Sequence, residues 1–341
     1  MRVQPRDPER PGLPATNLTG RVLCQPLPNA SLDITSHYMD SKSDLDLNGA
    51  FAGDDPNYDF RNQNFLLAGR SRVSFLNDRL EQVTRLSFSK HRRETDNDFD
   101  PDHPFDNEDS LYRGQILNLD TQTNLRLHRT NTLTAGVEME HDQGEFEYNA
   151  LFFGFPSTTD FTGRTATKMG YYLQDYIELG DRWFTTLGVR WDNHNRYGRA
   201  FTYRGATNFL IPETGTTLRA SYGTGFKAPT LFQLFSAFGN QGLEAETSKG
   251  WDAGVEPSLF RNRLQVGATY FNNNVDEMIQ FDPAAFLSEN IGRVRTQGAE
   301  SYALTSPFKW LRVRASYTYT HTRDMDREEP LLRRPSHKMA I

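Results

Sequence analysis

The sequence predicts an all-β fold, a transmembrane antiparallel β-barrel, from three observations. Apolar and polar residues alternate along extended stretches, of which Leu311 to Asp324 is a clear example. Such a stretch exceeds the about five or six residues of a usual soluble strand and fits the roughly nine to eleven needed to cross a bilayer at a tilt. Short and long connections alternate, and Trp and Tyr residues lie near strand ends, as in outer-membrane barrels.

The stretch from Leu311 to Asp324 indicates what the two faces meet. Its odd-numbered residues up to Tyr319 are apolar or aromatic, whereas Arg312 and Arg314 lie on the other parity. Successive side chains of a strand point to opposite faces. We expect the odd face to meet lipid and the arginines to meet a wet lumen. The reverse assignment would place two arginines in hydrocarbon, at about 2–4 kcal/mol each near the midplane.

The same alternation predicts about fifteen strands along the chain. They lie at residues 18–25, 30–39, 63–75, 81–90, 112–127, 132–142, 167–178, 182–192, 201–211, 216–222, 249–257, 263–272, 291–304, 310–323 and 336–341. Long polar connections are expected at 40–62, 91–111, 143–166, 223–248, 273–290 and 324–335. Residues 1–17 are predicted to be an irregular N-terminal segment, and residues 18–341 a partial barrel.

Composition and short sequence motifs exclude several classes of protein. The net charge of −6 argues against a nucleic-acid groove, which needs a basic stripe. The single cysteine, Cys24, allows no intrachain disulfide, and no apolar run is long enough for a transmembrane helix. The N-terminus, MRVQPRDPERPGLPATN, has no signal-peptide pattern. Neither a nucleophile-elbow Gly-x-Ser-x-Gly nor a phosphate-binding Gly-x-x-x-x-Gly-Lys occurs, so we predict that the chain is not an enzyme.

Specific motifs lie in the C-terminal third. SYGTGFKAPTLFQLF (Ser221 to Phe235) is followed by GNQGLEAETSKGWDAGVEP (Gly239 to Pro257), and NIGRVRTQGAESYA and PLLRRPSHKMAI come later. These stretches resemble the TonB-dependent outer-membrane receptor family, although Gln241 and Ala245 replace two prolines of its pattern. The resemblance implies a barrel of about 22 strands in the outer membrane of a Gram-negative bacterium, a preceding plug domain and the partner TonB. The chain shows no plug and roughly 15 strands, so it is interpreted as a fragment.

Within the family, the resemblance is greatest to the vitamin B12 (cobalamin) receptor branch. It rests on the Pro-Leu-Leu-Arg-Arg passage and on two Asp-rich loops, Asp40 to Phe60 and Glu94 to Asp109. The resemblance implies active uptake of cobalamin or a similar large metal chelate. The alternatives are a ferric-siderophore receptor of the same family, a passive porin-like barrel and a soluble all-β binding module.

The Asp-rich loops predict a metal site. Calcium prefers six to eight oxygen ligands, and carboxylates spaced by one residue can converge on it. In cobalamin receptors such loops bind Ca²⁺, so the resemblance adds weight to this expectation. The alternative is a solvated acidic loop without metal. The candidate ligands are Asp40, Asp44, Asp46, Asp96, Asp98, Asp100 and Asp102.

Loop phenylalanines are candidate substrate contacts, because a large chelate needs apolar surface. The alternative is that these rings pack against each other. Leu231, Phe232, Leu234 and Phe235 have helical spacing, which predicts a short loop helix after the Lys-Ala-Pro turn. The candidate substrate-binding residues are Phe152, Phe153, Phe155, Phe232 and Phe235.

Overall fold

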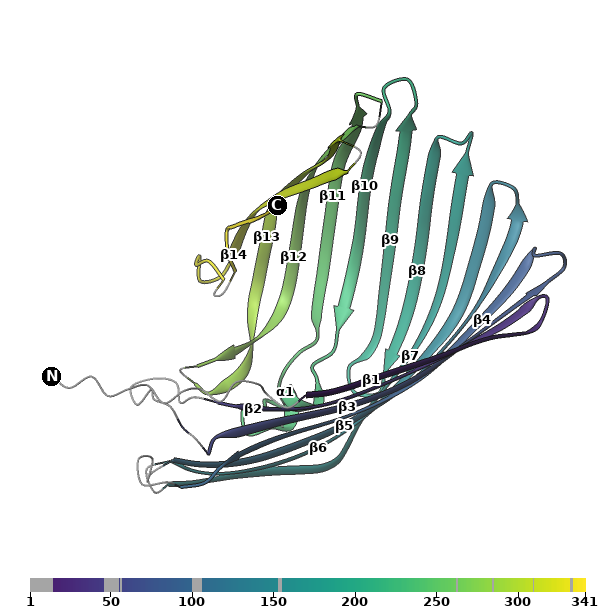
Figure 1. Ribbon diagram of the computed structural model, residues 1–341. Coiled ribbons are helices and arrows are strands. Elements are labelled where there is room, and N and C mark those ends of the chain that lie inside the picture. The colour runs from purple at the N-terminus through teal and green to yellow at the C-terminus, as the bar shows by residue number, and fades with distance from the viewer. Residues whose placement is uncertain are drawn as a thin grey trace.

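The computed structural model shows one curved antiparallel sheet that forms an open trough (Figure 1). The first strands form the floor of the trough, the middle strands rise as its wall, and the last strands curl over it. The structure describes residues 15–45, 55, 57–99, 106–152, 155–261, 263–283, 285–308, 310–331 and 334–341.

Within these residues the sheet has 15 strands in sequence order, each hydrogen-bonded to the next. The strands are β1 Ala15–Leu27, β2 Ala30–Asp44, β3 Asp59–Phe75, β4 Leu80–Asn97, β5 Asp106–His128, β6 Asn131–Phe152, β7 Phe155–Leu179, β8 Trp183–His194, β9 Gly198–Ile211, β10 Thr216–Lys227, β11 Glu246–Leu259, β12 Leu264–Asp282, β13 Leu287–Phe308, β14 Leu311–Asp324 and β15 His337–Ala340. One short helix, α1 Leu231–Phe235, lies between β10 and β11. The all-β, antiparallel prediction is confirmed. The described residues contain no plug-like globular domain.

All fifteen predicted strands are present, but their ends differ from the prediction. β1 begins at Ala15, before the predicted boundary at residue 18. The predicted long connection at 143–166 is wrong, because β6 runs to Phe152 and β7 starts at Phe155. In the β6 extension the apolar residues change parity: Phe146, Tyr148 and Ala150 are buried on one face, whereas Leu133 to Met139 of the same strand have the opposite parity. The backbone stays paired with β7 throughout.

The two faces of the sheet differ as the sequence predicts. Leu117, Leu187, Val189 and Trp191 are exposed on one face, which we call the outer face. The other face, called the inner face, carries ion pairs such as Arg85 with Asp120 (2.6 Å). Trp183 and Trp191 are exposed near the two ends of β8, as expected for aromatic girdles. Tyr270 is also exposed but lies within β12, because that strand runs on to Asp282, beyond its predicted end. The helix search found no candidate membrane span in the described part of the chain.

Candidate functional site

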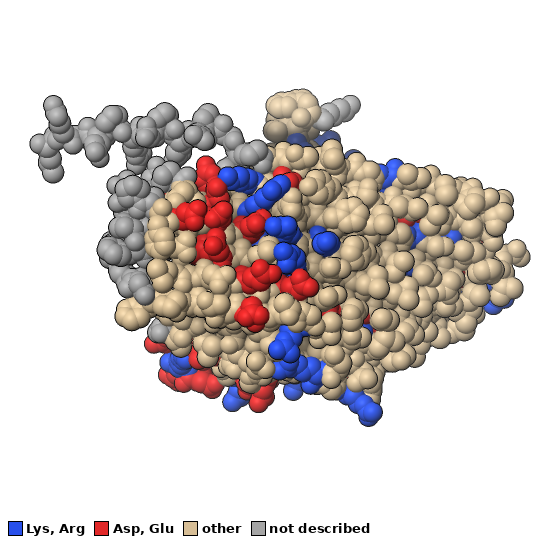
Figure 2. All heavy atoms as spheres, turned by 90° about the horizontal axis from the view of Figure 1, so that it is seen from below, with Lys and Arg blue, Asp and Glu red and all other residues tan. Residues whose placement is uncertain are grey.

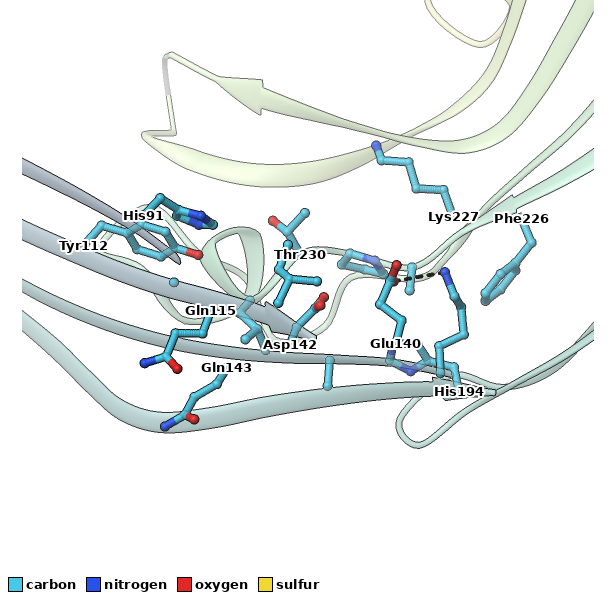
Figure 3. A pocket seen from close by; sticks show the side chains of 17 residues that line it. His91, Tyr112, Gln115, Glu140, Asp142, Gln143, His194, Phe226, Lys227 and Thr230 are labelled. Atoms are coloured by element: carbon cyan, nitrogen blue, oxygen red, sulfur yellow. Dashed lines mark hydrogen bonds and ion pairs between the residues drawn. The ribbon is translucent and has the colours of Figure 1, made fainter. Parts of the chain in front are cut away.

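A cavity of about 360 Å³ lies on the inner face, towards the end of the sheet where the long connections lie. Figure 3 shows its side chains, which come from β4, β5, β6, β7, β8 and β10, from the turn before α1 and from α1 itself. His91, Tyr112, Asp142, His194 and Lys227 face the cavity. Gln115 and Gln143 point to the opposite side of the sheet, as strand alternation requires. The volume falls within the usual range for small-ligand pockets.

One wall of the cavity is aromatic. The rings of His91 and Tyr112 stack with centroids 5.6 Å apart, and Phe232 of α1 contacts Tyr112 edge-on at 6.0 Å. Gly114 is the register partner of His91, and a Cβ there would overlap the imidazole. Burial lowers the pKa of His91 and raises the pKa of Tyr112. At neutral pH this wall is therefore uncharged.

The opposite wall of the cavity carries lysines, and each of them forms an ion pair with a glutamate. Lys168 donates to Glu140 at 3.0 Å, and Lys227 donates to Glu246 at 2.8 Å. Burial, followed by the nearby Lys168 ammonium, lowers the pKa of His194. Both lysines are partly exposed, so an anionic ligand can compete for them with the carboxylates.

Asp142 has a buried carboxylate oxygen without a hydrogen-bond partner among the described residues. It lies in β6 beyond Met139, the last apolar residue of that strand on the outer face, and so outside the membrane-spanning band. Burial, followed by the charge of Glu140, raises the pKa of Asp142 to about 6. Its Oδ1 atom is buried and accepts no hydrogen bond from the described residues. A bound ligand that donates a proton there would satisfy it.

α1 closes one end of the cavity. Thr230 caps the helix by accepting from the Gln233 amide, and the Gln233 side chain accepts in return from the Thr230 amide. This capping box lets a very short helix form directly after Pro229. Leu231 and Leu234 are buried, and Leu231 lines the cavity. The predicted loop helix is thus confirmed.

The guanidinium groups of two arginines lie over the ring of Phe235 in α1. The Arg164 guanidinium lies 4.6 Å from its ring centroid, and that of Arg196 lies 5.0 Å from it. Phe161 contacts the same ring at 5.8 Å. Within the described residues neither arginine forms an ion pair, and an aromatic ring holds both cations in place. This arrangement places two guanidiniums without carboxylate partners among the described residues beside the cavity.

Comparison with known proteins agrees with the fold. The sequence matches the family described as "TonB dependent receptor-like, beta-barrel" over residues 11–341. The chain belongs to the TonB-dependent receptor family. It is therefore a protein of the Gram-negative outer membrane, and the prediction that it is not an enzyme is confirmed.

Solved structures of receptors show the same fold at low identity. A ferric enterobactin receptor from Pseudomonas aeruginosa has a TM-score of 0.75 at 19% identity, covering 95% of this chain and 54% of that one. The alcaligin outer-membrane receptor from Bordetella pertussis has a TM-score of 0.66 at 17% identity, covering 95% and 56%. A copper transporter has a TM-score of 0.74 at 15% identity, covering 93% and 53%. The chain thus spans about half the length of these proteins.

The predicted substrate-binding phenylalanines of this receptor barrel fall in two places. Phe232 and Phe235 join the aromatic cluster beside the cavity, where Phe232 also contacts Phe146 at 5.4 Å. Phe155 is 77% exposed at the start of β7 and is the register partner of Phe152. Phe153 and the Phe152 side chain lie outside the described residues. The structure therefore brings together two of the five candidates.

The predicted calcium ligands are also divided. Asp40 accepts two hydrogen bonds from Arg61, which lower its pKa to about 2. Asp44 ends β2 and Asp96 lies near the end of β4, with Asp98 just beyond that end. Asp46, Asp100 and Asp102 lie outside the described residues.

Asp44 and Asp96 belong to a row of carboxylates on the outer face. Register places Asp44 opposite Asp59, Asp59 opposite Asp96, and Asp96 opposite Asp109. We call these four residues the acidic row. Burial, followed by the charge of Asp96, raises the pKa of Asp109. No three described His, Cys, Asp or Glu side chains are arranged to hold a metal ion.

Sequence reasoning missed the cavity itself. Asp142 has the even parity of Glu138 and Glu140, so its inward direction could have been predicted from β6 alone. The approach of Lys227 to β6, by contrast, depends on how the sheet curves. The Phe235 contact with Arg164 and Arg196 likewise requires the folded loop, since the three residues lie in different connections or strands.

Proposed function

We propose that this chain is the ligand-binding part of a receptor for ferric siderophores, the alternative that the sequence left open. The observation that carries the proposal is the pair of arginines on Phe235 beside a cavity with two further cations, Lys168 and Lys227. Ferric chelates with oxygen ligands are large, often anionic and partly aromatic. Cations backed by aromatic rings fit such a ligand.

The proposal extends to the energy source. We infer that uptake by the intact receptor is driven through TonB, as the family name implies. The relatives of similar fold include proteins whose names specify ferric enterobactin and alcaligin, which supports a siderophore-type cargo. A cobalamin cargo has less support, because the single phosphodiester of cobalamin offers the arginines less negative charge than a ferric catecholate does. In addition, much of the Asp-rich loops lies outside the described residues.

Calcium binding is a separate proposal on the outer face. Its support is the acidic row, in which like charges directly opposite each other are unfavourable unless a cation is shared. One carboxylate per strand at about 4.8 Å spacing brings two oxygens to one ion, so further ligands must come from elsewhere. Asp44→Asn with Asp96→Asn should abolish calcium binding measured by titration calorimetry.

Ligand titration in detergent micelles tests the cargo. The chain is titrated with a ferric catecholate chelate, a ferric hydroxamate chelate and cyanocobalamin, and binding is followed by Trp fluorescence. We expect a ferric chelate to bind and the Arg164→Gln, Arg196→Gln double variant to lose about tenfold in affinity or more. Arg199→Gln, which removes an outer-face arginine, is the matched control and should bind normally. Tighter binding of cyanocobalamin, unaffected by the double variant, would contradict the proposal.

A further inference from the structure

One carboxylate lies on the outer face among residues that meet hydrocarbon. Figure 2 shows part of this face, where Lys, Arg, Asp and Glu gather towards one end and few lie over the remainder. In the second half of β7 the outer-face residues are Tyr171, Leu173, Asp175 and Ile177. Of the described outer-face residues in the apolar stretches of β6 to β10, Asp175 is the one charged side chain. A charge that faces hydrocarbon is rare and usually functional.

Register places Asp175 near the middle of the membrane. It lies directly opposite Leu187 of β8, and Leu187 is midway between Trp183 and Trp191, the aromatic residues near the two ends of that strand. Four residues of a strand tilted by roughly 40° span about 10 Å of depth, so the headgroups lie about that far away on either side. An aspartate side chain is too short to cover this distance. Asp175 therefore faces lipid tails, which offer no hydrogen-bond donor.

The chain itself satisfies Asp175 only in part. Asn131 donates from Nδ2 to Oδ2 of Asp175 at 3.3 Å, whereas Oδ1 is buried and accepts no hydrogen bond from the described residues. An ionised carboxylate can accept about four hydrogen bonds. One long bond from an amide compensates poorly for the removal of a carboxylate from water. A further donor at this depth would therefore stabilise Asp175.

Such a donor lies on the same face. Trp183 donates from Nε1 to the Thr207 hydroxyl at 2.7 Å, and the hydroxyl oxygens of Thr207 and Thr185 are 2.9 Å apart. When Thr207 donates to Thr185, the Thr185 hydroxyl keeps its own hydrogen for another acceptor. Thr185 pairs with Ile177, two residues from Asp175, so Thr185 and Asp175 are diagonal neighbours about 7–8 Å apart and differ in depth by no more than that. The same face thus carries a needy acceptor and an available donor at similar depth.

A groove of about 530 Å³ lies beside these two groups on the outer face. Gly205 forms its floor, because it lies directly opposite Leu187 and Tyr222 and has no side chain to fill the space. The rings of Tyr203 and Tyr222 stack along one side, with centroids 5.9 Å apart. Small residues of this kind let two membrane-spanning surfaces approach closely. The side chains around the groove are Leu133, Leu173, Asp175, Leu187, Tyr203 and Tyr222.

We propose that this surface is an interface between two copies of the chain, related by a two-fold axis along the membrane normal that passes between β7 and β8. Such an axis exchanges sides but keeps depth, so each residue meets residues of the other copy at its own depth. Thr185 of each copy would donate to Asp175 of the other, and these reciprocal hydrogen bonds are strong away from water. The outer face of β6 of each copy would lie over the groove of the other.

A second copy fits this surface better than lipid does. An acyl chain can fill the groove over Gly205, but it supplies no donor to Asp175. Only another membrane-spanning protein brings side-chain donors to this depth, and a copy of this chain carries Thr185 there. The interface is independent of the cavity and of any cargo.

Sedimentation equilibrium of the whole 341-residue chain in density-matched micelles of neutral detergent measures the dimer dissociation constant. We expect the unaltered chain to form dimers, and Asp175→Leu and Thr185→Val each to raise the dissociation constant at least about tenfold. Asp175→Asn, whose amide oxygen still accepts, should raise it less than about threefold. The matched control is Ser301→Val, which removes a hydroxyl from the outer face of β13 and should leave the dissociation constant unchanged.

Crosslinking locates the interface. Cys24 is the one cysteine of the chain, so Cys24→Ser gives a background without thiols. In that background Leu187→Cys places a thiol close to the proposed axis, and Val255→Cys places one on the outer face of β11. Both positions are exposed. A short bismaleimide should link the Leu187→Cys variant into dimers and leave the Val255→Cys variant unlinked.

Three outcomes would overturn the proposal. Monomers at every concentration would leave lipid as the occupant of the groove. Dimers that survive both Asp175→Leu and Thr185→Val would indicate contact elsewhere, for example through the edge strands β1 and β15 of the sheet. Equal crosslinking at Leu187→Cys and Val255→Cys would show that the contacts are collisions without a fixed interface. If Asp175→Leu fails to fold, Thr185→Val and the two crosslinking variants still decide the question.

Discussion

The imidazole of His91 stacks on the phenol ring of Tyr112, with centroids 5.6 Å apart and an interplanar angle of 21°. The two residues lie on adjacent strands but are not register partners: His91 pairs with Gly114, and Tyr112 pairs with Arg93. The imidazole therefore extends across Gly114, where no side chain obstructs it, to reach the phenol. A glycine on β5 thus shapes the aromatic wall of the cavity.

Gly114→Ala should disrupt this wall. The added Cβ would overlap the His91 ring, so the imidazole must rotate away from Tyr112. We expect a loss of about 1–2 kcal/mol in the free energy of unfolding, measured by urea titration in micelles, and weaker binding of the ferric chelate. Gly69→Ala is the matched control, since a Cβ there meets no atom within 4 Å. Equal effects of the two substitutions would contradict this account.

Asp142 should make stability depend on pH. Its pKa of about 6 lies above the ordinary value of 3.8, so between these values the folded chain binds more protons than the unfolded chain. The free energy of unfolding therefore falls as pH rises from about 4 to about 6. Asp142→Asn should abolish this fall and stabilise the chain above pH 6 by about 1 kcal/mol, a value that allows for solvent screening at a half-exposed site.

The control for Asp142 is Asp160→Asn, which changes an exposed carboxylate in the same hairpin, closer to its turn. Urea titrations at pH 4 and pH 7 are compared for both variants. Asp142→Asn should match the unaltered chain at pH 4 and exceed it at pH 7. An advantage of the same size at both pH values would rule out titration of Asp142 as the cause.

Thr230→Ala should loosen α1. The substitution removes the hydroxyl that accepts from the Gln233 amide, at a cost of about 1 kcal/mol. Because α1 has only five residues, the whole helix should exchange its amide hydrogens faster. Hydrogen exchange of the segment 230–236 measures this change, and Thr230→Ser should restore slow exchange. Unchanged exchange in Thr230→Ala would show that packing of Leu231 and Leu234 alone holds the helix.

The sequence predicts the strands better than the site for a physical reason. In the membrane band, lipid on one side enforces alternation, and Leu311 to Tyr319 show it without exception. Above the band the pattern of β6 reverses: Phe146, Tyr148 and Ala150 are buried in a hydrophobic cluster, and Glu145 and Glu147 lie on the other face. This change of parity, together with the many polar residues, explains why the stretch is predicted as a connection.

The candidate site is likewise predicted only in part from the sequence. Inward parity is predictable for Glu140 and Asp142, because one strand carries both. Which strands share a cavity depends on curvature, and curvature brings Lys227 of β10 to the same cavity as Asp142 of β6. The composition of the Asp-rich loops predicts a metal site, yet Asp44 and Asp96 lie on the outer face and the cavity lies on the inner one.

Among the cations of the inner face, Arg190 should contribute most to the free energy of unfolding. It contacts Glu138 at 2.8 Å and Asp192 at 2.7 Å, and Asp192 is only 6% exposed. Arg190→Gln would leave two neighbouring carboxylates without their shared cation. Breaking a buried pair costs several kcal/mol, and for this partly exposed arginine we expect about 2 kcal/mol in the free energy of unfolding. Arg182→Gln breaks the exposed pair with Glu213 and should cost less than about 0.5 kcal/mol. Urea titration in micelles measures both, and equal costs would mean that water, rather than Arg190, solvates these carboxylates.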